Sequence, residues 1–327
     1  MHTGRSILVT GGTGSFGKAF IRRALERLSP HRLVVFSRDE QKQWEMEVAF
    51  REAGLDPDNR LRFFIGDVRD RDRLELALHG IDTVVHAAAM KIVPTAEYNP
   101  FECILTNVHG AENVVKAGLR AGVKRVVALS TDKAASPINL YGASKLAADK
   151  IMVAANNFAG GTGCRFAVVR YGNVVGSRGS VIPFFQRLIA EGADFLPITD
   201  ERMTRFWITL EQGVDFVISS LEAMEGGEIF VPKIPSMKMA DLARALAPDL
   251  PHRIVGIRPG EKLHEVMITE DDARATIERE DRYVILPFGD SRLTDASVRR
   301  VAEGFRYASN TNTEWLDAAG LKAMMAS

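Results

Sequence analysis

The sequence predicts an α/β fold, with a doubly wound parallel sheet in residues 1–172 and a smaller α/β cap domain in residues 173–327. Short apolar segments alternate with helix-length segments through the first half, which is typical of parallel strands buried on both faces. A glycine-rich turn directly follows the first apolar segment. After Arg170 the alternation ends and prolines interrupt the chain repeatedly. These three features favour one large sheet, with a cap near the carboxyl ends of its strands.

Each element of the predicted sheet corresponds to one apolar segment. The predicted strands are residues 6–10, 33–36, 61–65, 83–86, 125–129 and 166–170, and the helices between them are 16–28, 38–53, 71–78, 101–120 and 141–158. In the cap, shorter helices are expected at 184–190, 210–224 and 240–246, with 206–230 packing back on the sheet domain. Thr311 and Glu314 match a capping box, which predicts a terminal helix from Thr311.

Composition excludes several classes of protein. The 42 Lys+Arg residues balance the 42 Asp+Glu residues, whereas nucleic-acid or membrane-surface binding needs surplus cations. The two cysteines, Cys103 and Cys164, exclude a disulfide framework or a Cys-rich zinc site, and we expect no metal. No run of about 18 apolar residues is present to span a bilayer, and Met1–Arg5 leads into the first strand without a leader. We therefore expect a cytoplasmic protein with neither a nucleic-acid nor a membrane partner.

The glycine-rich turn, with the sequence Thr-Gly-Gly-Thr-Gly-Ser-Phe-Gly over residues 10–17, predicts a dinucleotide site. Glycines at these spacings permit a tight turn, close approach of a pyrophosphate, and close packing of helix on strand. The N-terminus of the following helix offers unpaired N–H groups to the anion. The alternative is a plain glycine-rich turn. The predicted pyrophosphate-binding residues are Gly11, Thr13, Gly14, Ser15, Phe16 and Gly17.

The end of the second strand favours NADP over NAD. Ser37 and Arg38 stand there, with Lys42 one turn further on, whereas an acidic residue is typical of NAD sites. Asp39 and Glu40 lie close by, and the alternative for Arg38 is a solvated residue at the start of a helix.

Two further segments complete the predicted cofactor site. Asp67 and Val68 follow the third strand, where they are expected to meet the adenine, although Asp67 is also suited to cap the next helix. Ala87 and Lys91 follow the fourth strand, and we expect Lys91 near both the nicotinamide and the substrate.

Tyr141 and Lys145 stand four residues apart, one helical turn, so both side chains project from one face. A nearby ammonium lowers the phenol pKa from its usual value of about 10, which makes Tyr141 a candidate base for a substrate hydroxyl. The same spacing occurs in ordinary surface helices, but here it follows Ser130-Thr131 at the end of a strand. This pattern resembles the extended short-chain dehydrogenase/reductase family over nearly the whole chain, which implies a Rossmann-like fold.

Asp132 and Lys133 place an acid and a base between Ser130 and Tyr141. Two such neighbours can divide proton donation and abstraction between them. Dehydration of a sugar needs this pair, because one group removes the proton next to a new ketone and another protonates the departing hydroxyl. The structural alternative is that Asp132 caps a turn and Lys133 is solvated.

The segment from Ser130 to Lys145 resembles the UDP-N-acetylglucosamine 4,6-dehydratases. Retaining members of that group commonly have Met where Tyr141 stands, so the chain is more similar to the soluble branch that inverts C5. That branch begins pseudaminic acid biosynthesis for flagellin and surface glycans. Further matching segments are 87–91, 97–100, 203–207, 232–235 and 258–262.

The resemblance implies a hydro-lyase that acts on UDP-N-acetylglucosamine and regenerates its NADP in each cycle. Tyr141, supported by Lys145, takes the proton of the 4-hydroxyl while hydride leaves C4. Lys133 removes the C5 proton as a neutral amine, if Lys91 or Lys145 lowers its pKa. Asp132 protonates the leaving C6 hydroxyl. Which of Asp132 and Lys133 returns the C5 proton is left open.

The UDP group is expected to lie against the cap. Arg205 and Arg258 suit a diphosphate, since guanidinium groups bind phosphate oxygens at two points. Residues 180–182 and 196–198 are expected to enclose the uracil. The resemblance also implies a homo-oligomer, a hexamer in that branch. The predicted substrate-binding residues are Lys91, Thr131, Asn173, Val181, Arg205, Arg258 and Glu261.

Three other functions compete with this interpretation. A nucleotide-sugar 4-epimerase shares the glycine turn and the Tyr-Lys spacing but does not need Asp132 and Lys133. A retaining dehydratase is disfavoured by Tyr141. A non-catalytic NADP-sensing regulator would not require Tyr141, Lys145 or Asp132, all of which are present.

Overall fold

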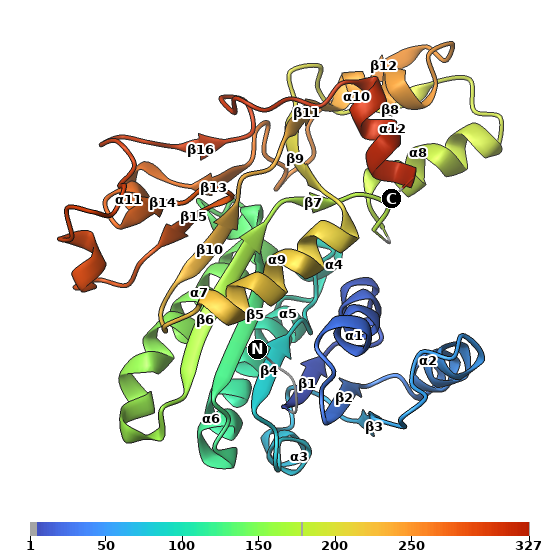
Figure 1. Cartoon of the computed structure of the whole chain (residues 1–327). Coiled ribbons are helices and arrows are strands. Elements are labelled where there is room, and N and C mark those ends of the chain that lie inside the picture. Colours follow the sequence, from blue (N-terminus) through green and yellow to red (C-terminus); the bar gives the residue numbers. More distant parts are fainter. Residues whose placement is uncertain (1–4, 178, 327) are drawn as a thin grey trace. The chain divides into compact units, whose positions relative to one another are not determined.

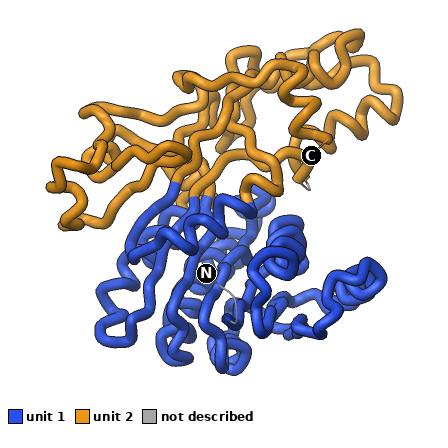
Figure 2. The backbone as a smooth tube through the Cα atoms, in the orientation of Figure 1, with its two compact units in different colours: residues 1–130, 144–169, 214–230 blue, residues 131–143, 170–213, 231–327 orange. Residues whose placement is uncertain are grey.

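The computed structural model describes residues 5–177 and 179–326, which form two compact units (Figure 2). The opening residues Met1–Gly4, on which the expectation of no leader segment rests, lie outside the described residues. Each unit is built from three separate stretches of chain. Unit 1 comprises residues 1–130, 144–169 and 214–230, and unit 2 comprises residues 131–143, 170–213 and 231–327.

Unit 1 contains a sheet with the strand order β10-β6-β5-β4-β1-β2-β3 (Figure 1). Parallel pairings join β1 to β2 and β4, β2 to β3, β4 to β5, and β10 to β6. The six predicted strands are confirmed, and β10 was not predicted. The strands are β1 Ser6–Thr10, β2 Arg32–Ser37, β3 Leu61–Ile65, β4 Thr83–His86, β5 Arg125–Thr131, β6 Arg165–Tyr171 and β10 Ile229–Pro232. The strand order runs in opposite directions from β1 and β4, and α/β sheets bind ligands at such a point.

Helices cover both faces of this sheet, as the doubly wound prediction requires (Figure 1). On one face α1 and α9 are joined by an ion pair of 3.0 Å between Arg23 and Asp215, and on the other α3 packs against α6. The predicted helix 101–120 is divided by a π-helical turn, η1. The helices are α1 Ser15–Arg27, α2 Glu40–Glu52, α3 Arg71–Ala77, α4 Val93–Tyr98, α5 Pro100–Ile104, η1 Leu105–His109, α6 Gly110–Ala121, α7 Leu140–Ala159, η3 Gly160–Thr162 and α9 Leu210–Ala223.

Unit 2 contains short strands where loops were expected. They pair as β11-β9-β7, β12-β8, β13-β16 and β14-β15. Their bounds are β7 Asn173–Val174, β8 Leu196–Ile198, β9 Thr204–Ile208, β11 Ser236–Lys238, β12 His252–Ile254, β13 Val266–Ile268, β14 Thr276–Glu278, β15 Arg282–Ile285 and β16 Tyr307–Ala308. The helices are η2 Asp132–Ala134, α8 Val181–Ala190, α10 Met239–Leu246, α11 Glu270–Ala273, η4 Ser291–Leu293 and α12 Ala318–Ala326.

The core of unit 2 forms around the fully buried Trp207 of β9. Ile182 and Phe185 of α8 and Leu242 of α10 belong to the same cluster. This apolar cluster anchors β9, so the neighbouring Arg205 is presented at a defined place.

The terminal helix begins at Ala318, so the prediction of a helix from Thr311 is wrong. Asn312 instead donates to the carbonyl of Ile234 at 2.8 Å, and Trp315 bridges to Ser236 of β11. These bonds hold the segment before α12 against β11. Residues 311–317 therefore pair with this part of unit 2 and do not form the first turns of a helix.

Candidate active site

The glycine turn after β1 has the close contacts that its sequence predicted. Gly11 has a φ of +67°, in the left-handed region, and a Cβ there would lie 2.9 Å from the Ala88 nitrogen. A Cβ on Gly17 would lie 2.5 Å from the Cα and the carbonyl oxygen of Gly12. The Gly14 N–H donates to the Gly11 carbonyl at 2.9 Å and closes the turn. Side chains at positions 11 and 17 would therefore force the turn or α1 to move.

This turn fits the pyrophosphate of a dinucleotide. Helix α1 begins at Ser15 after the N-cap Gly14, no side chain caps it, and its first turn holds no acidic residue. The N–H groups of the first turn therefore remain available to an anion. Ala87 approaches the turn from β4, with its carbonyl carbon 3.0 Å from a Cβ built on Gly11.

His86, at the end of β4, holds the residue that precedes the glycine turn. Its Nδ1 lies 2.8 Å from the Thr10 Oγ1, which also accepts from the N–H groups of Ala87 and Ala88. Burial lowers the pKa of His86 to about 3, and Lys145 contributes in the same direction. A neutral imidazole therefore ties the end of β1 to the end of β4.

This lowered pKa predicts a pH dependence of folding. In the unfolded chain this histidine takes up a proton below pH 6.5, whereas in the folded chain it does so only near pH 3. The contribution of neutral His86 to the free energy of unfolding is therefore fully present above pH 6.5 and is lost as the pH falls from 6.5 toward 3. Between pH 7 and pH 4, wild type is expected to lose about 3 kcal/mol more unfolding free energy than His86→Gln. Urea unfolding at several pH values measures this difference, with exposed His31→Gln as control. Parallel pH curves for wild type and His86→Gln would contradict it.

Ion pairs link the residues predicted for the adenosine end of the cofactor. The side chain of Arg38 is 58% exposed, with its Nη1 3.5 Å from Asp67 Oδ2. Lys42 has its own partner in Asp39. Ser37 is buried and its Oγ accepts from Gln43 at 3.0 Å.

Asp67 is not the cap of α3, because Asp70 fills that position. Burial raises the pKa of Asp67. Hydrogen bonds from Arg69 lower this pKa by a larger amount, so the net shift is downward. Asp67 is therefore an ionised acceptor beside Arg38. The neighbouring Val68 is buried, and its carbonyl accepts from Asn113 at 3.0 Å.

Helix α7 confirms that Tyr141 and Lys145 lie one turn apart on one helix. Tyr141 is buried at 8% exposure. The Lys145 ammonium donates to the Leu129 carbonyl at 2.6 Å, and burial lowers its pKa. Ser130 donates to the carboxylate of Asp149 at 2.8 Å.

Asn107 is a site residue that the sequence analysis missed. It lies in the π-helical turn η1, a distortion that is frequent at functional sites. Its side chain donates to the Met90 carbonyl at 3.0 Å and to Ser144 at 2.9 Å, and accepts from the Met90 N–H at 2.8 Å. Asn107 thereby fixes the chain just before Lys91, which is itself exposed. The sequence carries no clear signal for this role, because Asn107 stands among other polar residues, Thr106 and His109, in the same turn.

The acid–base pair lies within unit 2, and Asp132 is completely buried. Its Oδ1 accepts from Thr131 Oγ1 at 2.9 Å and from the Lys133 ammonium at 3.0 Å. Its Oδ2 is buried and has no hydrogen-bond partner among the described residues. Burial, with a contribution from Glu265, raises the pKa of Asp132. Thr131 is the residue that caps η2, so the capping alternative for Asp132 does not hold.

Lys133 is surrounded by oxygen atoms. Its ammonium lies 3.0 Å from Asp132 Oδ1, 3.4 Å from Glu265 Oε1 and 3.4 Å from Asn173 Oδ1. Burial alone would lower the pKa of Lys133, but the two carboxylates raise it, so the net shift is upward. This is opposite to the lowering expected from Lys91 or Lys145, and the charged ammonium is the resting form.

Glu265 is the second site residue that sequence reasoning missed. It is 2% exposed, and its carboxylate faces Lys133 and, at 3.7 and 3.9 Å, Arg205 and Lys262. Burial raises the pKa of Glu265, but these cations lower it more, and the net shift is downward. The available signal was its place three residues after the matching segment 258–262.

Arg205 and Arg258 differ in how much of the guanidinium group is free to bind a phosphate. The Arg205 guanidinium donates to three carbonyls, those of Thr204 at 2.7 Å, Lys262 at 2.9 Å and Leu263 at 3.2 Å. Arg258 is 61% exposed, 3.9 Å from Glu261. Only Arg258 therefore presents a free guanidinium face.

The loop that carries Arg258 and Glu261 is bonded to the turn before Tyr141. Asn139 donates to the Gly260 carbonyl at 2.7 Å and accepts from the Gly142 N–H at 2.7 Å. Lys262 donates to the Ala135 carbonyl at 2.6 Å. The Glu261 Oε2 is buried and has no hydrogen-bond partner among the described residues. This loop and residues 131–143 therefore form one assembly within unit 2.

The remaining substrate candidates lie on β7 and α8. Asn173 meets Lys133, as described above, and Val181 begins α8 and packs on the unit 2 core. Ile182 and Ile198, from the segments expected around the uracil, are each 1% exposed within that core. In the described part of the chain no His, Cys, Asp and Glu group could hold a metal ion, and no helix is long and apolar enough to cross a membrane.

Comparisons with known proteins identify relatives over nearly the full chain. A family model described as polysaccharide biosynthesis protein matches residues 7–287. The UDP-N-acetylglucosamine 4,6-dehydratase (inverting) of Campylobacter jejuni subsp. jejuni serotype O:23/36 (strain 81-176) is 56% identical, covering 96% of this chain and 95% of its own. The UDP-glucose 4-epimerase of Rickettsia canadensis (strain McKiel) is 41% identical, covering 87% of this chain and 84% of its own.

Solved structures agree with the predicted Rossmann-like α/β class. Pen from Bacillus thuringiensis matches with a TM-score of 0.89 at 35% identity, over 100% of this chain and 98% of its own. DesIV, a dTDP-glucose 4,6-dehydratase from Streptomyces venezuelae with NAD and TYD bound, matches with a TM-score of 0.69 at 26% identity, over 79% of this chain and 86% of its own. The chain therefore belongs to the polysaccharide biosynthesis protein family, within the extended short-chain dehydrogenase/reductases.

Proposed function

We propose that the chain is an NADP-dependent UDP-N-acetylglucosamine 4,6-dehydratase that inverts C5. The observation that carries this proposal is the buried Asp132, which holds Lys133 through one oxygen and leaves the other without a partner. An acid and a base in contact suit an elimination of water. The 56% identity to an inverting dehydratase supports the same reaction.

The proposed roles follow from the surroundings of each group. The glycine turn and Arg38 would hold NADP, which would supply the acceptor for the sugar hydride and its return within the same cycle. Tyr141, with Lys145 one turn along α7, takes the proton of the 4-hydroxyl. Thr131 orients the sugar through its hydroxyl, and the Asp132 carboxyl, once protonated, delivers its proton to the leaving C6 hydroxyl.

Lys133 is charged at rest and must lose a proton to act as the base at C5. Its ammonium lies 3.0 Å from Asp132 Oδ1. Transfer of one proton over this contact converts the ion pair into a neutral amine and a carboxylic acid. These are the base and the acid that the elimination needs, so we propose that the pair is activated by this single transfer.

Glu265 completes the proposed machinery as a positioning residue, because its carboxylate lies 3.4 Å from the Lys133 ammonium, which also contacts Asp132 at 3.0 Å. Its charge raises the pKa of both Asp132 and Lys133. Glu265→Gln is therefore expected to move the pH profile of kcat toward lower pH and to reduce kcat by about tenfold to a hundredfold. Steady-state kinetics across pH measures this, with exposed Glu303→Gln as control. A pH profile that keeps its wild-type position would contradict the assigned role.

Arg38 is proposed to bind the 2′-phosphate of NADP. Arg38→Ala is expected to weaken NADP binding by about tenfold and NAD binding much less, because a charge-assisted contact to the extra phosphate is lost. Fluorescence titration with each dinucleotide measures both affinities. Arg71→Ala, at a partly exposed arginine paired with Asp72, serves as the control. Equal weakening of the two dinucleotides would remove Arg38 from the phosphate site.

For the substrate, we propose that Arg258 binds the diphosphate and Glu261 accepts from the ribose hydroxyls, with Asn173 near the sugar. Arg205 contacts the diphosphate only if one of its carbonyl bonds is exchanged. We retain residues 1–172 as the cofactor-binding part and 173–327 as mainly substrate-binding. The cytoplasmic location, the homo-oligomeric state and the place at the start of pseudaminic acid biosynthesis are also proposals.

A 4-epimerase is the second candidate, since a UDP-glucose 4-epimerase is 41% identical. Proton NMR of UDP-N-acetylglucosamine with the protein and NADP in deuterated water separates the candidates. A new C6 methyl with deuterium at an inverted C5 supports the proposal. A methyl with retained C5 identifies the retaining reaction, and a change at C4 alone identifies an epimerase. No change at all contradicts an activity on this substrate.

A further inference from the structure

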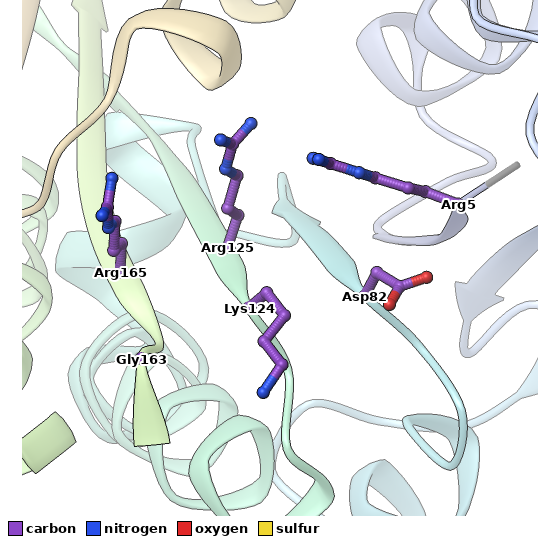
Figure 3. A pocket seen from close by; sticks show the side chains of 6 residues that line it. All are labelled: Arg5, Asp82, Lys124, Arg125, Gly163 and Arg165. Carbon is purple, nitrogen blue, oxygen red and sulfur yellow. The ribbon is translucent and has the colours of Figure 1, made fainter. Parts of the chain in front are cut away.

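Four cationic residues gather at the amino-terminal ends of adjacent strands in unit 1 (Figure 3). Arg5 precedes β1, Lys124 and Arg125 stand at the start of β5, and Arg165 begins β6. Because β6, β5, β4 and β1 are neighbours in the sheet, these strand starts meet at one edge. With Gly163 and Asp82 they line a hollow of about 420 Å³, within the usual range for small-molecule sites.

Main-chain bonds fix the walls of this hollow. The N–H groups of Lys124 and Arg125 donate to the Asp82 carbonyl at 2.9 and 3.1 Å, and the Arg165 N–H donates to the Lys124 carbonyl at 2.9 Å. Arg125 and Arg165 are the first residues of strands, and Arg5 and Lys124 directly precede strands.

The positive charge of the hollow is not neutralised within the described chain. Asp82, its one carboxylate, accepts from the Ser6 N–H at 2.9 Å. Arg125 donates to the Leu221 carbonyl, and no carboxylate lies within ion-pair distance of Arg5, Arg125 or Arg165 among the described residues. In Figure 3 the guanidinium groups of Arg5 and Arg165 lie on either side of Arg125, whereas the Lys124 ammonium extends away. Burial and these two neighbours lower the pKa of Arg125, and Glu222 opposes them weakly.

We propose that this hollow binds an anion with two or more phosphoryl groups, such as pyrophosphate or the phosphates of a nucleotide. Guanidinium groups bind phosphate oxygens in pairs, and three of them line this hollow, from the first residues of β5 and β6 and from the residue before β1. A pocket lined by one sign of charge also concentrates anions. Lys124, Gly163 and Arg165 are exposed, so a free anion can enter. This site is separate in sequence from the glycine turn and does not depend on the proposed reaction.

Isothermal titration calorimetry with inorganic pyrophosphate tests the proposal on the full chain. Saturating NADP and UDP are present to fill the other phosphate-binding groups. We compare wild type with Arg165→Gln, whose side chain makes no hydrogen bond or ion pair with described residues, and with the control Arg120→Gln on α6, which removes a surface pair with Glu75. Wild type and Arg120→Gln are expected to bind pyrophosphate, and Arg165→Gln about tenfold or more weakly.

A second titration with ADP identifies the source of the phosphates. Tighter binding of ADP than of pyrophosphate, with the same loss in Arg165→Gln, supports a nucleotide ligand, and equal binding supports recognition of the phosphates alone. Equal pyrophosphate affinity in wild type and Arg165→Gln would overturn the proposal. So would the absence of binding at millimolar pyrophosphate. A change of oligomeric state in Arg165→Gln without anion binding would instead assign the cluster to an interface between copies and overturn it as well.

Discussion

Asp132→Asn is expected to lower the turnover of UDP-N-acetylglucosamine by about 10³-fold, within the range for loss of a general acid. Asparagine keeps the size of the side chain and can still accept from Thr131 and Lys133, so the cluster stays assembled. It cannot take the proton of Lys133 or deliver one to a leaving hydroxyl. The expected result therefore separates the chemistry of Asp132 from its packing.

The measurement is the initial rate of formation of the C6 methyl signal by proton NMR. Urea unfolding and dinucleotide binding, measured on the same variant, show whether it is folded and still binds NADP. Asp249→Asn, an exposed residue of unit 2, is the matched control and is expected to keep wild-type turnover. A rate for Asp132→Asn within a few fold of wild type would remove it from the reaction.

Gly17→Ala is expected to raise the dissociation constant for NADP by about a hundredfold and to lower the free energy of unfolding by about 1–3 kcal/mol. The added methyl would stand 2.5 Å from the Gly12 backbone, so α1 must shift away from the turn. That shift moves the N–H groups of the first turn, which are proposed to meet the pyrophosphate. Both effects have the same steric cause.

Gly161→Ala provides the control for this experiment. Gly161 is exposed, its φ is not positive, and a Cβ there would find no atom within 4 Å among the described residues. Its unfolding free energy is expected to change by no more than about 0.5 kcal/mol. Fluorescence titration and urea unfolding measure both variants. Wild-type NADP affinity in Gly17→Ala would place the dinucleotide away from this turn.

The strands of the unit 1 sheet were predictable because each is a short apolar run. Ile7, Leu8 and Val9 are completely buried, and every residue of such a strand faces a helix layer. The short strands of unit 2 carry no comparable signal. Asn173–Val174 forms β7 only because β9 lies beside it, so the pairing partner and not the local sequence decides the element.

At the terminal helix, too, a distant pairing partner outweighs the preference of the local sequence. Thr311 and Glu314 have the spacing of a capping box, but Asn312 bonds to the Ile234 carbonyl, and the helix begins later, at Ala318. A helix cap contributes only about 1 kcal/mol, and pairing with a distant segment outweighs it here.

The sequence by itself determined the fold class of unit 1, the glycine turn and the spacing of Tyr141 and Lys145, because sterics and periodicity act over a few residues. The tertiary structure decided the ionisation of the acid–base pair. Burial and the charge of Glu265 raise the pKa of Asp132, whereas the charges of Asp132 and Glu265 raise the pKa of Lys133 against the effect of burial. Glu265 lies far from both residues in sequence. Ionisation depends on desolvation and on charges within a few ångströms, and only the folded chain brings those charges together.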